Sequence, residues 1–166
     1  LHVRNMSLKS TRAKYLEILA ERNGIVGGIP DISRFDDNAL DMPKNLRAHW
    51  EKANYAAMVE DMDTSVGIVI DELEALGLDD NTYVIFTSDN GGGSSNAPLQ
   101  GGKAKMWEGG LRVPMIATGP GIPANTQCDT PVAQWDLLTT FHDLAGSDAP
   151  LPEDLDGVSL RPVLCL

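Results

Sequence analysis

The sequence places a carboxylate and an amide side by side at the end of an apolar segment. Residues 83–88 (YVIFTS) form a continuous aromatic and β-branched run, which Asp89, Asn90 and three glycines follow. Ca²⁺ and Mg²⁺ prefer oxygen ligands of this kind, and glycines let a ligand approach the backbone. Asp-Asn-Gly is also ordinary turn chemistry, so the motif alone leaves a metal site and a simple turn both open.

A second segment carries positive charge on a glycine-rich loop. Lys103 follows Gly101 and Gly102, and Lys105 and Arg112 lie further along the same segment. A lysine displayed in this way offers an anion a compact charge with three donors. The GxxxxGK[ST] spacing of a P-loop is absent. The alternative is a flexible surface loop with solvated lysines.

The chemistry that these two segments could perform depends on the secondary-structure elements that position them. A strand at residues 83–88, directly after a long helix, favours the central strand of a parallel sheet that is covered on both faces. Ligand sites of open α/β sheets lie at the carboxyl ends of strands. A metal at Asp89 and Asn90 and a nearby Lys103 would there bind a dianionic ester group and stabilise charge developing on it.

The remaining elements follow from periodicity and end signals. Helices are predicted over residues 8–22, 48–76 and 134–145, and a second strand over residues 113–118. Residues 24–48 are rich in Gly, Pro, Asp and Asn and are predicted to form a long surface loop.

The helix ends and faces are also predicted. Ser10 or Thr11 is expected to cap the first helix, and Asn23-Gly24 to end it. In the long helix, Glu60 and Asp61 belong to a run of acids that is expected to lie mostly on a solvated face. The apolar stripe of that helix consists of Tyr55, Met58, Met62, Val66, Val69, Ile70, Leu73 and Leu76.

Composition limits the class of partner. The 166 residues carry a net charge of −11 and give a pI near 4.5, which disfavours nucleic acid and anionic membranes as main partners. No apolar stretch reaches the roughly 18 residues of a transmembrane segment. Cys128 and Cys165 make neither a disulfide framework nor a zinc cluster.

The segment from Tyr55 to about Pro162 resembles the sulfatase family of the alkaline-phosphatase-like superfamily. The matching pieces are YAAMVEDMD (55–63), TSDNGG (87–92), GGK (101–103), WEGGLRVP (107–114), DLL (136–138) and DGVSL (156–160). The resemblance implies an α/β fold, a partial sulfatase/alkaline-phosphatase-like sandwich with a mostly parallel sheet flanked by helices. Residues 1–166 would form a single partial catalytic domain.

The resemblance also implies roles for individual residues. Asp89 and Asn90 would ligate the divalent cation, Ca²⁺ or Mg²⁺, and Lys103 would be a catalytic residue that contacts the sulfate group. The family's active-site histidine, written His-x-Pro, maps best onto His2, which would be a second catalytic and sulfate-contacting residue. The proline is missing here, and a frayed terminal histidine is the alternative reading of His2.

The parent enzyme implied by the resemblance hydrolyses sulfate esters with a formylglycine nucleophile. Its substrate would be a small sulfate ester or a sulfated glycan. The Cys/Ser-x-Pro/Ala-x-Arg motif that yields formylglycine is absent from this sequence, and so is the family's amino-terminal Asp-Asp pair. We therefore expect the chain to be the later part of a catalytic domain, inactive alone and with half a metal site. Neither Cys128 nor Cys165 is expected to be a nucleophile.

Two other functions stay open. One is a phosphoester or phosphonate hydrolase of the same superfamily, and the other is a non-catalytic anion-binding or interaction domain derived from a sulfatase. Exposed sheet edges would allow a homo-oligomer. Family members are often periplasmic, secreted or lysosomal, but the sequence does not give a compartment. His49 and His142 are expected to be structural, and Glu108 and Arg112 to belong to a packing and turn element in which Arg112 pairs with a carboxylate.

Overall fold

A computed structural model describes residues 8–23, 44–93 and 95–164. The chain divides into two compact units, Leu1–Ala75 and Leu76–Leu166. Most of the loop predicted at residues 24–48 lies outside the described residues. No helix in the described ranges is long and apolar enough to span a membrane.

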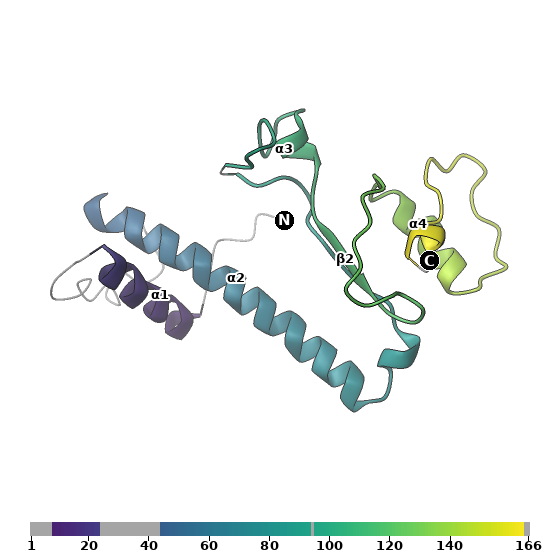
Figure 1. The fold of residues 1–166 in the computed structure, drawn as a ribbon, viewed down its shortest axis with the longest axis horizontal. Coiled ribbons are helices and arrows are strands. Elements are labelled where there is room, and N and C mark those ends of the chain that lie inside the picture. The colour runs from purple at the N-terminus through teal and green to yellow at the C-terminus, as the bar shows by residue number, and fades with distance from the viewer. Residues whose placement is uncertain (1–7, 24–43, 94, 165–166) are drawn as a thin grey trace. The chain divides into compact units, whose positions relative to one another are not determined.

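Within residues 8–23 and 44–75, the first unit contains two helices, α1 (Lys9–Arg22) and α2 (Lys44–Ala75), which lie side by side (Figure 1). Both were predicted, although α2 begins at Lys44 rather than at residue 48. Asn23 ends α1 as expected, and its side chain donates to the Leu19 carbonyl at 2.7 Å. The predicted cap at Ser10 or Thr11 is wrong, because the N-cap position is Leu8.

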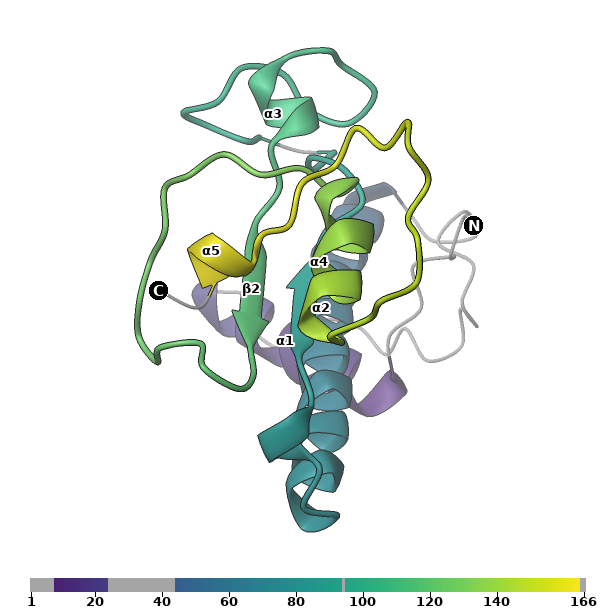
Figure 2. The ribbon, with the colours of Figure 1, turned by 90° about the vertical axis from the view of Figure 1, so that its right-hand side faces the viewer.

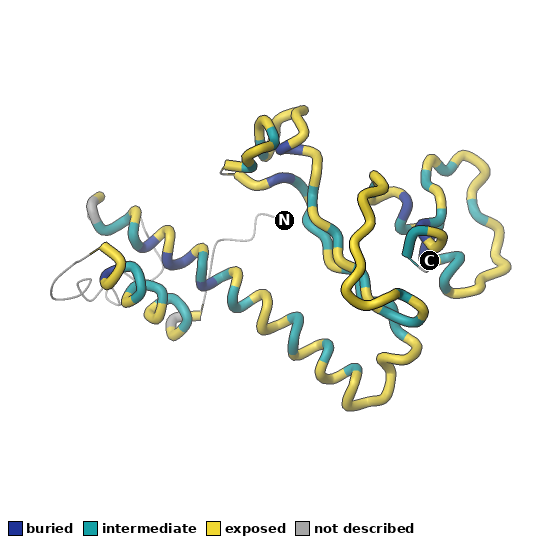
Figure 3. Tube along the Cα trace, viewed as in Figure 1, coloured by how far each residue is buried: buried dark blue, intermediate teal, exposed yellow. Residues whose placement is uncertain are grey.

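One tryptophan and two alanines on α2 form the buried apolar contact with α1. Trp50, Ala53 and Ala57 of α2 and Ala20 of α1 are buried, and Ala53 and Ala57 have no exposed surface. The predicted apolar stripe is not the buried face, because Tyr55, Met62, Val69 and Leu76 of that stripe are exposed. Figure 3 shows the buried positions confined to one part of α2. The reason is length: α1 has 14 residues and α2 has 32, so α1 covers only part of its partner.

The acids expected on the solvated face of α2 include two that contact α1. Asp61 accepts hydrogen bonds from the Leu8 backbone N–H and the Thr11 hydroxyl, both at 2.7 Å. Glu60 pairs with Lys14 at 2.8 Å. This corrects the sequence prediction for these two residues, since periodicity identifies a polar face but not a neighbouring helix that supplies donors.

The second unit combines a strand pair with short helices. Its elements are η2 (Asp79–Asn81), β1 (Val84–Thr87), α3 (Glu108–Leu111), β2 (Met115–Thr118), α4 (Asp136–Leu144) and α5 (Arg161–Leu164). Both strands and α4 were predicted, whereas the single-turn helices α3 and α5 were not. The mixture of helix and sheet agrees with the predicted α/β class.

The strand pair does not have the predicted parallel arrangement. β1 and β2 pair antiparallel, from Val84 opposite Thr118 to Thr87 opposite Met115. A loop with one helical turn joins them, whereas a parallel pair needs a crossover connection. A mostly parallel sheet is therefore not confirmed by the described strands. Neither strand has a buried residue, and Ile116 is 65% exposed, so the two faces are not covered as expected.

Figure 2 shows α4 and the segment that follows it, which ends in α5. Polar side chains attach this segment to α4. The buried Asp136 carboxylate accepts from the backbone N–H groups of Ala133 at 2.8 Å and Val158 at 3.0 Å. The fully buried Thr140 hydroxyl accepts from the Leu160 N–H at 2.9 Å. The DLL and DGVSL pieces thus meet in a structural connection, which satisfies backbone groups that no helix or sheet pairs.

Candidate functional site

The segment after β1 is attached to two other parts of the second unit. The Thr87 hydroxyl donates to the Pro114 carbonyl at 3.1 Å, next to the start of β2. The Gln134 side chain, which precedes α4, donates to the Ser88 carbonyl. The Ser88 hydroxyl donates to the Asn90 carbonyl at 3.0 Å and closes a tight turn. These bonds fix the backbone on both sides of Asp89.

Glycines allow this segment to cross the loop that ends in α3. The Gly91 N–H donates to the Gly110 carbonyl at 3.0 Å, and the Gly109 N–H donates to the Gln100 carbonyl at 2.8 Å. A Cβ built on Gly91 would overlap the Gly109 carbonyl oxygen, and one built on Gly109 would overlap the Gly101 carbonyl oxygen. Only glycine fits where these two backbone segments cross, so Gly91 and Gly109 serve to let backbone pack closely on backbone.

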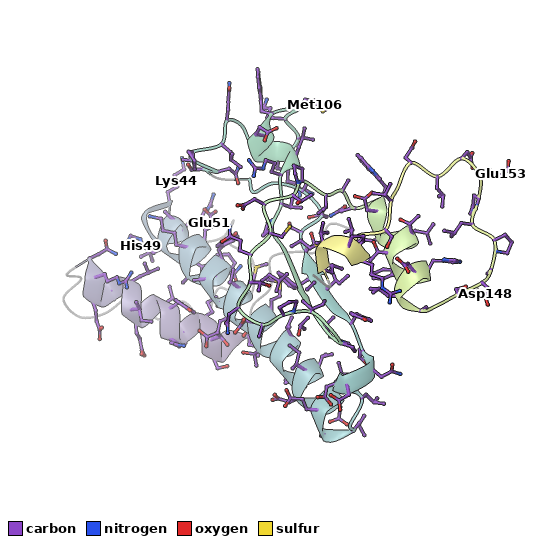
Figure 4. The ribbon with its side chains drawn as sticks, turned by 45° about the vertical axis from the view of Figure 1, so that its right-hand side comes forward. Lys44, His49, Glu51, Met106, Asp148 and Glu153 are labelled. Atoms are coloured by element: carbon purple, nitrogen blue, oxygen red, sulfur yellow. The ribbon has the colours of Figure 1, made fainter. Side chains whose placement is uncertain are left out.

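The loop that carries Lys103 hydrogen-bonds directly to the segment after Asp89 and Asn90. The Lys103 N–H donates to the Gly92 carbonyl at 3.0 Å. The side chains of Lys103 and Asp89 are exposed, and Asn90 is half-buried. The structure thus brings the backbones of both sequence motifs together just beyond the carboxyl end of β1. The loop that carries Lys103 is open to solvent, as its Met106 side chain, labelled in Figure 4, is 86% exposed.

The amide side chain of Asn96 lies between these two segments, and sequence reasoning did not identify it. It hydrogen-bonds to both the N–H and the carbonyl of Gly92 and to the carbonyl of Gly101. No periodic or motif signal identifies such a residue. An asparagine inside a glycine-rich loop, between two candidate motifs, is the only hint that the sequence offers.

Other residues singled out from the sequence have plain roles. Arg112 pairs with Glu108 at 3.6 Å within α3 and its cap, which confirms the predicted carboxylate partner. The Nε2 of His142 lies 2.7 Å from the Ala149 carbonyl oxygen, in keeping with a structural role. Cys128 is an exposed free thiol whose pKa is lowered by hydrogen bonds from Thr130. His2 and Cys165 lie outside the described residues.

The donor types at Asp89 and Asn90 suit a hard divalent cation, but their number does not complete a site. Ca²⁺ takes six to eight oxygen ligands. Within residues 8–23, 44–93 and 95–164, no three His, Cys, Asp or Glu side chains gather closely enough to hold an ion. These two residues therefore fit part of a coordination shell.

The chain belongs to the sulfatase family. The sequence model of that family, described as Sulfatase, matches residues 30–147, which is more than half of the chain. Steryl-sulfatase of Homo sapiens is 40% identical over 141 residues. That alignment covers 76% of this chain and 24% of the human protein.

Solved structures agree with the sequence relatives. The structure of Ps i-CgsB in complex with k-i-k-neocarrahexaose matches 98% of this chain and 31% of its own, with a TM-score of 0.70 and 30% identity. The structure of BT4656 in complex with D-glucosamine-2-N,6-O-disulfate matches 92% of this chain and 28% of its own. Its TM-score is 0.60 and its identity 28%. The chain thus has a sulfatase-like fold and spans about a quarter to a third of these relatives.

Proposed function

We propose that the segment from β1 to α3 forms one wall of a sulfatase active site, in which Lys103 binds the sulfate group. The observation that carries this proposal is the hydrogen bond from the Lys103 N–H to the Gly92 carbonyl, together with membership of the sulfatase family. That bond keeps the Lys103 backbone close to the predicted metal ligands Asp89 and Asn90. The reaction of the whole protein would be hydrolysis of a sulfate ester.

Charge supports an anion site at this loop. The chain as a whole carries a net charge of −11, so an anion needs locally placed cations. Lys103 and Lys105 are exposed on the loop, whereas Arg112 is paired with Glu108. A lysine ammonium beside a sulfate oxygen would stabilise the negative charge that grows in the transition state.

Asp89 and Asn90 would hold part of a Ca²⁺ or Mg²⁺ site in this proposal. A bound cation would supply additional charge stabilisation at the ester oxygens. The turn closed by Ser88 limits how far the two ligand residues can move, which reduces the entropy lost on binding. The rest of the coordination shell would come from residues other than these two.

Besides the remaining metal ligands, the proposed active site needs a nucleophile, which these 166 residues do not supply. The sequence contains no Cys/Ser-x-Pro/Ala-x-Arg motif, so the formylglycine of the proposed reaction has no source here. His2 stays the predicted second contact to the sulfate group. We expect the chain by itself to be inactive, because charge stabilisation without a nucleophile does not cleave the ester.

The substrate class is a sulfate ester, either a small molecule or a sulfated glycan. The proteins that this chain resembles include a steryl-sulfatase, one solved in complex with neocarrahexaose and one solved in complex with D-glucosamine-2-N,6-O-disulfate. A phosphoester hydrolase has no comparable support among them. A sulfatase-derived anion-binding domain is the second candidate, favoured by the missing nucleophile motif.

Titration with sodium sulfate, followed by ¹⁵N nuclear magnetic resonance of the chain, tests the proposed site. We expect saturable shifts of the Gly102 and Lys103 amides that Lys103→Ala abolishes. Sodium chloride at equal ionic strength controls for screening. The exposed Lys52 of α2 provides a matched control as Lys52→Ala, which should leave the shifts unchanged. Sulfate shifts that persist in Lys103→Ala would contradict the proposal.

A second set of measurements tests whether the chain alone contains a complete catalytic site and a complete metal site. With an aryl sulfate and Ca²⁺, the chain should show no turnover, and calorimetry should give Ca²⁺ binding weaker than about 1 mM. Turnover that Lys103→Ala abolishes would mean that the chain contains a complete catalytic site. Micromolar Ca²⁺ binding that Asp89→Ala removes would contradict a partial shell.

A further inference from the structure

Asn96 makes more side-chain hydrogen bonds to the site segments than a simple turn requires. Its Oδ1 accepts from the Gly92 N–H at 3.2 Å. Its Nδ2 donates to the Gly92 carbonyl at 2.9 Å and to the Gly101 carbonyl at 3.2 Å. The side chain therefore uses both its acceptor and its donor ends on backbone groups.

The two glycines that the Asn96 side chain contacts lie next to the two predicted site motifs. Gly92 closely follows Asn90, and Gly101 closely precedes Lys103. The Gly92 carbonyl also accepts from the Lys103 N–H at 3.0 Å, so both of its lone pairs are used. One amide side chain thus connects the end of the predicted metal-ligand segment to the start of the lysine loop.

Both glycines that Asn96 contacts are closely packed, Gly92 against the amide itself and Gly101 against Trp107. A Cβ on Gly92 would lie 2.9 Å from the Asn96 Oδ1, closer than real Cβ contacts. Gly101 has a φ of +78°, which favours glycine, and a Cβ there would lie 2.9 Å from the Trp107 side chain. The amide fits against Gly92 because that residue has no side chain, whereas the missing side chain of Gly101 leaves room for Trp107.

We propose that Asn96 is the positioning residue of the sulfate site, which holds the Lys103 loop against the Asp89–Asn90 segment. The inference deepens the proposed function and depends on it for its ligand. Asn96 acts through Lys103 and does not touch the anion itself. Without its amide, the loop is held to this segment by the backbone bonds from Lys103 to Gly92 and from Gly91 to Gly110, and residues 101–103 sample positions away from Asp89. Lys103 then binds sulfate more weakly although its own side chain is intact.

Hydrogen exchange measures the positioning directly and needs no ligand. In Asn96→Ala we expect exchange at the Lys103 amide to accelerate about tenfold, as loss of two or three ordinary hydrogen bonds allows. Amides of α4 should keep their wild-type rates. Asn96→Asp keeps an acceptor for the Gly92 N–H but loses both donations, so it should also accelerate exchange at Lys103. Asn81→Ala, an exposed change at the end of η2, is the matched control and should have no effect.

Sulfate titration then connects positioning to binding. We expect Asn96→Ala and Asn96→Asp to weaken the sulfate response of the Lys103 amide several-fold, while Asn81→Ala leaves it unchanged. Unchanged exchange at Lys103 in both Asn96 variants would overturn the inference. Equal acceleration at Lys103 and throughout α4 would also overturn it, because Asn96 would then support general stability.

The two proposals fail in different ways. If the wild-type chain shows no sulfate response but Lys103 exchange accelerates in the Asn96 variants, the proposed function is wrong and the loop-holding role of Asn96 stands. If wild type binds sulfate through Lys103 and the Asn96 variants bind it equally well, the proposed function stands and the positioning role is wrong.

Discussion

The helix pair of the first unit and the loops around Lys103 are held together by different kinds of contact. Side chains far apart in sequence join α1 to α2, including the Asp61 carboxylate and the Lys14 ammonium. Backbone groups, glycines and the amide of Asn96 join the Lys103 loop to the end of β1. The helix pair should therefore be sensitive to shortened side chains, and the loops to added ones.

The largest effect should come from adding a methyl group to the loops. Gly91→Ala forces the backbone apart at Gly109, because the new Cβ would overlap the Gly109 carbonyl oxygen. We expect a loss of about 3 kcal/mol in the stability of this crossing. Hydrogen exchange at the Lys103 amide measures the loss locally.

Gly93→Ala provides the control for that prediction. A Cβ at Gly93 has no neighbour within 4 Å, so the change should be close to neutral. If the two alanine variants exchange at the same rate, backbone crossing does not hold these loops together, and the comparison with the helix pair breaks down.

A smaller effect is expected from shortening a side chain between the helices. Asp61→Ala removes the acceptor for the Leu8 N–H and the Thr11 hydroxyl, at a cost of about 1 kcal/mol. Urea unfolding followed by helical circular dichroism reports on α1 and α2. The exposed Asp63 on the same helix gives the control Asp63→Ala, which should change stability little. Equal losses in both variants would show that negative charge on α2, and not these hydrogen bonds, sets the effect.

The smallest effect should be a pH dependence in the helix pair. A hydrogen bond from Lys14, and then one from Tyr15, lowers the pKa of Glu60 below its ordinary value. A carboxyl with a depressed folded-state pKa contributes stability above its unfolded pKa and loses it as the pH falls through the folded value. Stability should therefore decline below about pH 5, and less steeply in Glu60→Gln. Glu51→Gln, at the exposed position labelled in Figure 4, should keep the wild-type slope.

Prediction from sequence worked best where a signal is local. The carboxyl end of α1, the two strands and α4 follow from periodicity and from residues such as Asn23, whereas the predicted cap at the start of α1 was wrong. The Asp89–Asn90 and Lys103 motifs were also visible, because residue type and spacing carry them. Asn96 was not visible, since its importance depends on which backbone groups its amide meets.

Prediction failed where the partner of an element decides its environment. The apolar stripe predicted on α2 is not the face that α1 covers, since Tyr55 and Val69 are exposed. The strand at residues 83–88 was expected in a covered parallel sheet, yet β1 pairs antiparallel with β2 and has no buried residue. Burial and strand direction depend on neighbours and connections, which a run of apolar residues does not encode.

The sequence by itself determined the family of this protein and the residue types that its chemistry would use. Family motifs are short, and their order along the chain is enough to recognise them. Only the tertiary structure decided that the Lys103 N–H meets the Gly92 carbonyl and that Asn96 lies between their segments. The physical reason is that these contacts arise where glycines let two backbone segments cross, and such a crossing leaves no periodic trace in the sequence.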